Sequence, residues 1–422
     1  MTLRTRHIME QIKRGNVPEG YKKTKAGIFP AGWDVYMLGD CLSRVERPVE
    51  VKPNELYTQI GIRSHGRGLF YKEPVTGAAL GNKAVFWIEP DCFIVNIVFA
   101  WEQAIGKTTQ SEVGMIGSHR FPMYRPVNDR VDIDYLISYF LTKRGTDILE
   151  AASPGGAGRN KTLGQDRFLK SKITLPPIEE QQKIAAILTT QDKVIKLKEK
   201  RLAEKQRQKK YLMQQLLTGK KRLPGFNGTW EKEKLGKCAS MCSGGTPDTK
   251  NEKYYGNDYI WISIKDMTSA GKYICSSERG LTEAGLLNCS ARLFPKGTIL
   301  FAMYASIGEC SIAETECCSS QAILGIEPDS KLNNEFLYYL LSNSKGYFKS
   351  FGQASSQPNL NKGIVQSIVV QIPEIEEQAA IAEVLSTVDR EIELLQQDIE
   401  QEKRKKKALM QLLLTGIVRV KT

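Results

Sequence analysis

The sequence is poor in histidine and contains no long run of apolar residues. Its three histidines lie within the first 119 of 422 positions, and its nine cysteines follow no spacing typical of a structural zinc site. No run approaches the ~18 apolar residues of a membrane span, and the charged N-terminus lacks the apolar core of a signal peptide. An odd number of cysteines without a disulfide framework favours a reducing compartment. We therefore expect a cytoplasmic protein with no metal site.

Catalytic motifs are missing as well. The sequence has no Gly-x-Ser-x-Gly nucleophile elbow, no His-Glu-x-x-His and no Asn-Pro-Pro-aromatic motif of amino-methyltransferases. The stretch AIGKTTQ at 104–110 ends like a phosphate-binding loop, but that motif requires a glycine where Trp101 stands. We therefore expect no catalytic residue and no cofactor bound by this chain, which leaves a binding and assembly protein.

Positive charge is plentiful. Sixty Lys and Arg residues against 47 Asp and Glu residues give a formal net charge of +13. This balance favours a polyanionic partner, with nucleic acid first and an anionic membrane surface second. A generally basic surface without a specific partner is the alternative reading of the charge alone.

The chain repeats part of itself at an offset of 197 residues. The segment IEEQ at 178–181 recurs at 375–378, and LMQ-x-LLTG at 212–219 recurs at 409–416. Trp33 and Cys41 likewise have counterparts in Trp230 and Cys238. Between about 42 and 160, the same offset finds almost no identity. The sequence therefore predicts two units, each a variable globular body followed by a similar tail.

Each tail has the pattern of a long helix. Prolines and glutamates stand at the start, and no interior Gly or Pro occurs before Gly219 or Gly416. Apolar residues recur at seven-residue steps, which predicts an apolar seam against another helix; one lysine interrupts each series. We expect the two helices to pair antiparallel, whereas the alternative folds each helix onto its own domain. The predicted helix-pairing residues are Leu188, Ile195, Leu202 and Leu216 with Leu385, Ile392, Ile399 and Leu413.

The bodies combine strand-like and helical segments. Apolar runs such as NKAVFWI and GTILFAMYA are separated by turns rich in Gly, Pro and Asn, and NNEFLYYLLSNSKG has helical periodicity. The predicted fold class is α+β (mixed α/β), with two globular domains separated by two long antiparallel coiled-coil helices in a pseudo-two-fold repeat. The predicted boundaries are an N-terminal arm at 1–25, a first domain at 26–175, a first helix at 176–222, a second domain at 223–372 and a second helix at 373–422.

Loops of both bodies carry side chains suited to DNA, because glycine lets the backbone approach a phosphate and arginine can bond a guanine edge. Each of these residues has an alternative reading as a solvated or structural group, and His119 and Tyr304 stand among apolar residues. The predicted DNA-binding residues of the first body are Arg63, His65, Arg67, Lys72, Lys107, Thr108, Ser118, His119, Arg120, Arg159 and Lys161. Those of the second body are Lys250, Tyr254, Lys265, Tyr304, Ser306, Gln321, Gln357 and Asn359.

These segments resemble the specificity subunits of Type I restriction-modification systems over nearly the whole chain. The resemblance rests on the two IEEQ helix starts, the two LMQ-x-LLTG helix ends, and the stretches SPGGAGRNKT, SHRFP and SGGTP…YYG…WISIKDM. Residues 8–12, IMEQI, also resemble LMQQL at 212–216, which in this family fits an N-terminal arm lying near the C-terminal helix.

The resemblance implies a division of labour in phage defence. Each body would be a target-recognition domain that reads one half of a split site in double-stranded DNA, and the helices would set the spacer. Two modification subunits holding S-adenosylmethionine would methylate adenine N6, and restriction subunits would use ATP and Mg. A stand-alone DNA-binding regulator or architectural protein is the alternative. The absence of a helix-turn-helix or zinc signature and the two unlike bodies argue against it.

Overall fold

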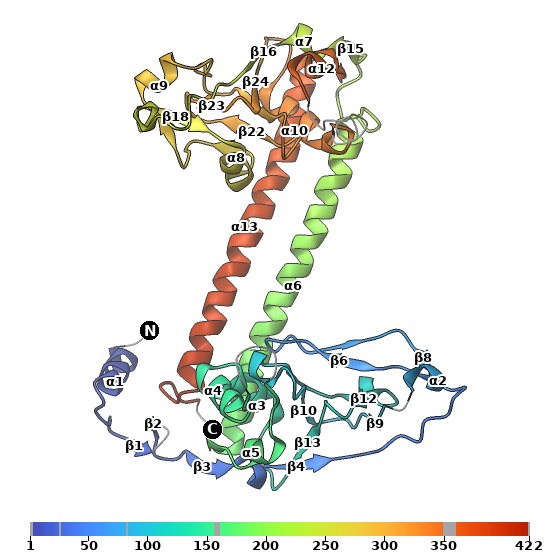
Figure 1. Cartoon of the computed structure of the whole chain (residues 1–422), viewed down its shortest axis with the longest axis vertical. Coiled ribbons are helices and arrows are strands. Elements are labelled where there is room, and N and C mark those ends of the chain that lie inside the picture. Colours follow the sequence, from blue (N-terminus) through green and yellow to red (C-terminus); the bar gives the residue numbers. More distant parts are fainter. Residues whose placement is uncertain (1–2, 25–26, 82, 156–160, 349–359, 421–422) are drawn as a thin grey trace. The chain divides into compact units, whose positions relative to one another are not determined.

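The structure is a computed structural model that describes residues 3–24, 27–81, 83–155, 161–348 and 360–420. The chain divides into two compact units: unit 1 comprises Met1–Glu199 and Asp398–Thr422, and unit 2 comprises Lys200–Gln397. The two long helices belong to both units (Figure 1). Helix α6 (Ile178–Leu216) begins in unit 1 and ends in unit 2, whereas α13 (Ile375–Leu413) begins in unit 2 and ends in unit 1.

Unit 1 is built around a four-stranded antiparallel sheet in the order β11-β10-β13-β4. Helices α3 (Ile133–Phe140), α4 (Lys143–Ala151) and α5 (Gln165–Leu169) contribute to the core beside it. A cluster of aromatic rings fills this core, with Phe93 and Phe168 stacked at 6.1 Å between ring centroids. The strands are β4 (Leu42–Val45), β10 (Phe93–Val95), β11 (Ile105–Lys107) and β13 (Met123–Pro126).

Paired short strands complete unit 1, in the combinations β1-β2, β3-β14, β5-β8, β6-β7 and β9-β12. Their bounds are β1 (Tyr21–Thr24), β2 (Gly27–Pro30), β3 (Asp34–Met37), β5 (Leu56–Tyr57), β6 (Ile60–Ile62), β7 (Leu69–Tyr71), β8 (Val75–Thr76), β9 (Val85–Trp87), β12 (Ile116–Ser118) and β14 (Lys172–Leu175). The helices α1 (Leu3–Lys13) and α2 (Gly77–Leu80) also belong to this unit.

Unit 2 has a five-stranded sheet, β16-β24-β21-β22-β19, a second sheet, β17-β20-β18-β23, and the pair β15-β25. The strands are β15 (Glu231–Lys234), β16 (Ala239–Ser243), β17 (Tyr255–Gly256), β18 (Tyr259–Ile262), β19 (Tyr273–Ile274), β20 (Gly280–Leu281), β21 (Ile299–Ala302), β22 (Cys310–Ala313), β23 (Cys318–Ser319), β24 (Ile323–Pro328) and β25 (Val369–Ile372). The helices are α7 (Leu235–Cys238), α8 (Ile264–Ala270), α9 (Glu283–Leu287), α10 (Asn334–Asn343) and α12 (Lys362–Ser367). The predicted mixture of helices and strands is confirmed.

The four strands of the main sheet in unit 1 have counterparts in four of the five strands of the main sheet in unit 2. The order β4-β13-β10-β11 in unit 1 corresponds to β16-β24-β21-β22 in unit 2. Val45 lies opposite Met123, and Cys242 lies opposite Gly325. Met123 also lies opposite Ile94, as Gly325 lies opposite Leu300. The domains therefore share a fold that the single offset of 197 does not reveal.

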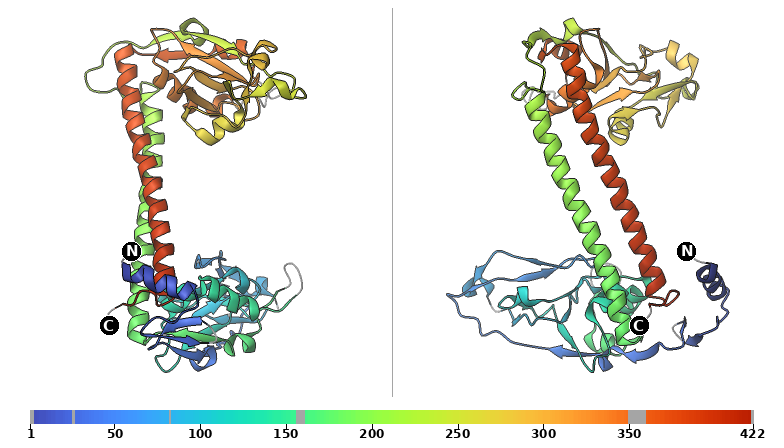
Figure 2. Two further views of the ribbon diagram at one scale, coloured as in Figure 1. Left: turned by 90° about the vertical axis from the view of Figure 1, so that its left-hand side faces the viewer. Right: turned by 180° about the vertical axis from the view of Figure 1, so that it is seen from behind.

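The predicted antiparallel pairing of the long helices is found within each unit (Figures 1 and 2). In unit 1, the Lys198 ammonium lies 2.8 Å from the Asp398 carboxylate and 2.9 Å from the Glu402 carboxylate. In unit 2, Lys205 lies 2.6 Å from Glu391. Lys209, further along α6, pairs with Asp389, which comes earlier in α13 than Glu391. A higher residue number on one helix is thus matched by a lower one on the other, as antiparallel neighbours require.

The lysines that interrupt the apolar series serve this pairing. Lys209 lies 2.6 Å from Asp389 in unit 2, and Lys406, at the equivalent position, lies 2.5 Å from Asp192 in unit 1. A cation at an otherwise apolar position is tolerated because a carboxylate of the facing helix neutralises it.

The seam residues divide into two groups. Ile195 and Ile399 are buried, and Leu202 and Ile392 are half-buried. Those nearest the helix ends join the domain cores, namely Leu188 and Leu413 in unit 1 and Leu216 and Leu385 in unit 2. The helices thus pack against each other and, at their ends, against the domain cores. The predicted pairing is confirmed, and the alternative of two separate helices, each folded onto its own domain, is not.

A buried glutamate joins the start of each long helix to its domain. In unit 1, Glu180 is fully buried and accepts a hydrogen bond from the Trp33 indole at 3.2 Å. The Arg419 guanidinium, which follows the end of α13, donates to both Glu180 oxygens at 2.7 and 2.8 Å. We call this set of interactions the Trp–Glu–Arg contact. It binds the domain, the start of one helix and the end of the other into one unit.

Unit 2 repeats the Trp–Glu–Arg contact at the offset of 197. Glu377 is buried, the Trp230 indole donates to it at 3.2 Å, and Arg222 donates to both carboxylate oxygens at 2.6 Å. The neighbouring glutamines Gln181 and Gln378 are also buried, and each bonds three backbone groups of its own unit. The repeated IEEQ segment is therefore the part of each helix that holds its domain.

The N-terminal and C-terminal segments meet in unit 1, as the family resemblance implies. The Tyr21 hydroxyl donates to the Gly416 carbonyl oxygen at 2.8 Å. Gly416 has a φ of 71°, and Gly219 has one of 68°, a backbone conformation that favours glycine after a helix end. Within the described residues, no helix is both long and apolar enough to span a membrane.

Replacement of Arg222 by alanine should destabilise the protein, because it leaves the buried Glu377 carboxylate without its guanidinium partner. We expect Arg222→Ala to lower the free energy of unfolding by about 2 kcal/mol, measured by urea denaturation. Amide hydrogen exchange should show the loss of protection at the start of α13. The control Arg404→Ala removes an exposed arginine of α13; an equal effect of both changes would contradict the role of the contact.

The helix pairing in unit 1 should also depend on pH. Hydrogen bonds from Lys198 and then Gln191 lower the pKa of Glu402 from 4.5 to about 2. A lowered folded-state pKa adds stability above pH 4.5, and this contribution is lost as the pH falls through 2. The stability difference between the natural chain and Glu402→Gln should therefore shrink over this range in denaturation curves. A difference that stays constant with pH would refute the assignment.

Candidate nucleic-acid interface

A hollow of about 480 Å³ with a mixed polar and apolar lining lies on the domain of unit 1. The cationic side chains that line it are Lys72, Lys83 and Arg120, and His119 and Gln59 add further polar groups. Lys72, Lys83 and Arg120 are exposed, so their charges face solvent rather than a protein partner. This set of donors is suited to a phosphate or to the acceptor edge of a base.

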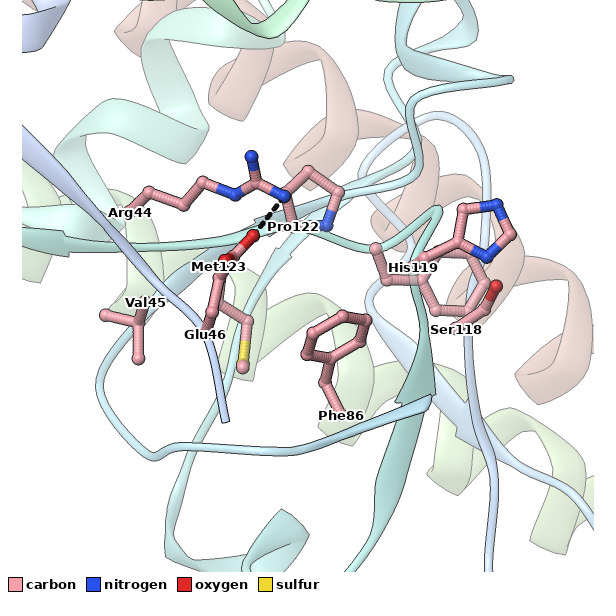
Figure 3. A pocket seen from close by; sticks show the side chains of 9 residues that line it. Arg44, Val45, Glu46, Phe86, Ser118, His119, Pro122 and Met123 are labelled. Atoms are coloured by element: carbon pink, nitrogen blue, oxygen red, sulfur yellow. Dashed lines mark ion pairs between the residues drawn. The ribbon is translucent and has the colours of Figure 1, made fainter. Parts of the chain in front are cut away.

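His119 also lines a smaller neighbouring hollow, which Figure 3 shows from close by. Ser118 and His119 lie together on one side of it, and the Arg44–Glu46 ion pair lies on the other. Ser118 ends β12 and its hydroxyl accepts a hydrogen bond from the Arg120 backbone N–H at 3.3 Å. The turn between β12 and β13 is thereby fixed, and it presents His119 and Arg120 outward.

Unit 2 has a polar hollow of about 390 Å³. Tyr304 and Gln321, both predicted from the sequence, line it together with Arg292 and Lys362. The Gln321 backbone N–H donates to the Thr246 hydroxyl at 3.3 Å, which holds the turn before β24. The structure thus brings two of the predicted residues of the second body to one site.

Sequence reasoning missed several lining residues, namely Gln59, Lys83, Ser243, Ser290, Arg292, Asn361 and Lys362. Gln59, Lys83, Ser290 and Arg292 lie outside the stretches that the sequence singled out for DNA. Ser243, Asn361 and Lys362 lie within or beside such stretches but were not among the predicted residues. Only strand pairing brings Gln59 next to the turn at 119, since Gln59 forms a bridge with Ile116 of β12.

Other predicted residues are engaged elsewhere. Thr108 is fully buried, and its hydroxyl donates to the Glu89 carbonyl oxygen at 2.6 Å and accepts from the Cys92 N–H at 3.0 Å. This placement corrects the prediction for Thr108, because the residue is a core group of the sheet and has no surface for DNA. Lys107 is half-buried and forms an ion pair with Asp134 at 2.8 Å.

The loop around 63–67 lies outside the hollow. The Arg63 guanidinium donates to the Leu69 carbonyl oxygen at 2.9 Å and stacks over the Phe70 ring, and Arg67 donates to the Ser64 carbonyl oxygen. His65 is exposed with a φ of 61°. These side chains remain at the surface, and their contact with DNA stays a prediction.

The remaining candidates are scattered. Lys161 lies over the Trp101 ring, and Lys265 is paired with Glu278. Lys250 is exposed, and Tyr254 and Ser306 are half-buried; none of the three lines the hollow of unit 2. Three others, Arg159, Gln357 and Asn359, lie outside the described residues.

The two domains thus share one fold, and each carries a hollow lined by its own set of side chains. The family model of the Type I restriction modification DNA specificity domain matches residues 88–206 and 227–403. The chain belongs to this family. A Type I specificity subunit is a DNA-recognition component of a restriction-modification complex, and the alternative of a stand-alone regulator is not favoured.

Relatives and solved structures agree with this family. The chain is 26% identical over 434 residues to the putative Type I restriction enzyme MjaX specificity subunit of Methanocaldococcus jannaschii, covering 96% of this chain and 98% of that protein. It is 36% identical over 167 residues to the MjaIX specificity subunit of the same organism, or 39% of each chain. A chain from a type I R-M system structure matches with a TM-score of 0.60 and 20% identity, covering 92% of this chain and 99% of that one. The HsdS subunit from Thermoanaerobacter tengcongensis matches with a TM-score of 0.51 and 18% identity, covering 92% and 98%.

Binding of a specific duplex by this specificity subunit should weaken steeply with salt. Removal of one phosphate-binding cation makes the dependence of log K on log salt concentration shallower by about 0.9. We expect Lys72→Ala to reduce the slope by about that amount in fluorescence anisotropy titrations at several salt concentrations. Lys143→Ala, which removes an exposed lysine paired with Asp147, should leave the slope unchanged. A salt-independent affinity would exclude phosphate contacts.

Proposed function

We propose that this specificity subunit has no catalytic activity by itself and that its two domains read the two halves of a split DNA site. The observation that carries the proposal is the contrast between the two kinds of surface. The Trp–Glu–Arg contact recurs residue for residue in both units, whereas the hollows are lined by different side chains. A repeated scaffold with unlike binding surfaces suits one kind of partner and two different sequences.

The repeated helices are the natural site for that common partner. We infer that two modification subunits bind there, hold S-adenosylmethionine and methylate adenine N6, and that restriction subunits supply ATP- and Mg-dependent cleavage. These cofactors belong to the partner subunits in this proposal, and the complex acts in the cytoplasm. The continuous α6 and α13, each of 39 residues, serve as the spacer between the half-sites.

A domain exchange tests independent reading of the half-sites. Residues 42–163 would be replaced by the corresponding segment of another specificity subunit, which leaves Trp33, Glu180 and the helix pair in place. We expect single-base methylation mapping of the full complex to show a change in one half of the recognised site only. The reciprocal exchange of residues 239–360 should change the other half.

Two outcomes would reject the proposed function. One is methyl transfer to DNA by the purified chain without a modification subunit, which would make the chain itself an enzyme. The other is a change in both half-sites after a single exchange, provided that the exchanged chain still co-purifies with its modification subunit. The co-purification separates a failure of recognition from a failure of assembly.

A further inference from the structure

The hollows of the two units occupy equivalent places in the repeated sheet. In unit 1, the Ile97 N–H donates to the Arg120 carbonyl oxygen at 3.0 Å, and the Leu163 N–H donates to the Ile97 carbonyl oxygen at 2.8 Å. In unit 2, Met303 makes the same two bonds, with Ala322 at 2.9 Å and with Leu360 at 3.1 Å. These backbone bonds align Ile97 with Met303 independently of the side chains.

The alignment pairs the residues that line the hollows. Val98 follows Ile97 as Tyr304 follows Met303, so these two residues are equivalent. His119 precedes Arg120 as Gln321 precedes Ala322, so these two are equivalent as well. Val98 and His119 both line the hollow of unit 1, and Tyr304 and Gln321 both line that of unit 2. The neighbouring strand agrees, because β4 lines the small hollow beside His119 and its equivalent β16 lines the hollow of unit 2.

The side chains of His119 and Gln321 have no role in holding their domains. Both are exposed, and within the described residues neither has a hydrogen-bond partner. Their backbone groups, in contrast, are fixed: His119 donates to the Ala84 carbonyl oxygen and Gln321 to the Thr246 hydroxyl. A rigid backbone that presents a free donor-acceptor side chain is the arrangement needed to read a base edge.

We propose that His119 and Gln321 are equivalent specificity-determining residues, each of which contacts the edge of one base pair in the half-site read by its own domain. Val98, which follows β10, and Tyr304, which follows β21, line the same hollows beside these residues. Nearby cations, Arg120 and Lys72 in unit 1 and Arg292 and Lys362 in unit 2, hold the flanking phosphates. This inference rests on the proposed function, since it names the residues that carry out the reading.

The test uses the full chain in complex with its modification subunit, acting on a randomised duplex library. Single-base methylation sequencing then gives the preference at every position. We expect His119→Ala to reduce discrimination about tenfold at one base pair of the half-site assigned to unit 1, with the other half unchanged. Gln321→Ala should do the same in the half-site assigned to unit 2. The control variants are His7→Ala, an exposed histidine of α1, and Gln371→Ala, an exposed glutamine of β25; both should retain the natural preference.

The inference is overturned if the alanine variants keep the natural preference in both halves, or if His119→Ala alters the half read by unit 2. Where an alanine variant methylates too weakly to sequence, binding of its complex to duplexes varied one base pair at a time gives the same readout. The variants His119→Gln and Gln321→His retain a donor and an acceptor and should shift the preferred base pair rather than abolish binding. A natural complex that methylates no split site would reject the proposed function itself, whereas unchanged variants of an active complex reject only this assignment.

Discussion

The buried carboxylates Glu180 and Glu377 are the constraint on which both units depend. A carboxylate removed from water is costly unless hydrogen bonds and an opposite charge compensate it. Each of these glutamates has that compensation only when three segments meet, namely the first part of the domain, the start of one long helix and the residue that follows the other helix. The requirement fixes how a domain sits on the helix pair within its unit, because a displaced partner would leave a buried charge unpaired.

This constraint explains which parts of the two units remain alike. Residues that build the Trp–Glu–Arg contact, the glutamines beside it and the glycines at the helix ends recur at one constant offset. The sheet strands keep the same order and register, but the offset is 197 at Val45 and Cys242, 202 at Met123 and Gly325, and 206 at Ile94 and Leu300. Segments of different length between the strands account for this drift.

The sequence predicted the scaffold well because its signals are local or periodic. The seven-residue pattern predicted the antiparallel helices, and the prolines and glycines predicted their ends. What the interrupting lysines do was not predictable, since the carboxylates that pair with Lys209 and Lys406 come from the other helix. The hollows were predicted only in part. Thr108 stood in a basic, hydroxyl-rich stretch and is nevertheless buried directly after β11. Lys83 and Arg292 line the hollows but gave no signal in the sequence.

The units differ where the domain covers the helix pair. Asp132 caps α3 and Asn333 caps α10, and the backbone N–H of each donates to the buried glutamine at the start of the long helix. The two caps are therefore equivalent. Six residues after each cap, Ser138 is the equivalent of Tyr339. The Tyr339 hydroxyl donates to the Asp389 carboxylate at 2.7 Å, and the same carboxylate forms the ion pair with Lys209. The Lys209 ammonium also lies over the Tyr339 ring. Burial, and then the Asp389 carboxylate, raise the pKa of Tyr339, which therefore remains a donor.

Serine is too short to make this contact in unit 1. There the Asp192–Lys406 pair persists, and a hollow of about 810 Å³ opens beside Lys406, lined by Tyr139 and Met410. Both units thus have the ion pair between the helices, but only in unit 2 does a domain tyrosine, Tyr339, bond its carboxylate. The buried glutamate already holds each domain on the helices, so the side chains on the adjoining surface can differ between the units without loss of the scaffold. For the same reason, the side chains that line the two hollows can differ.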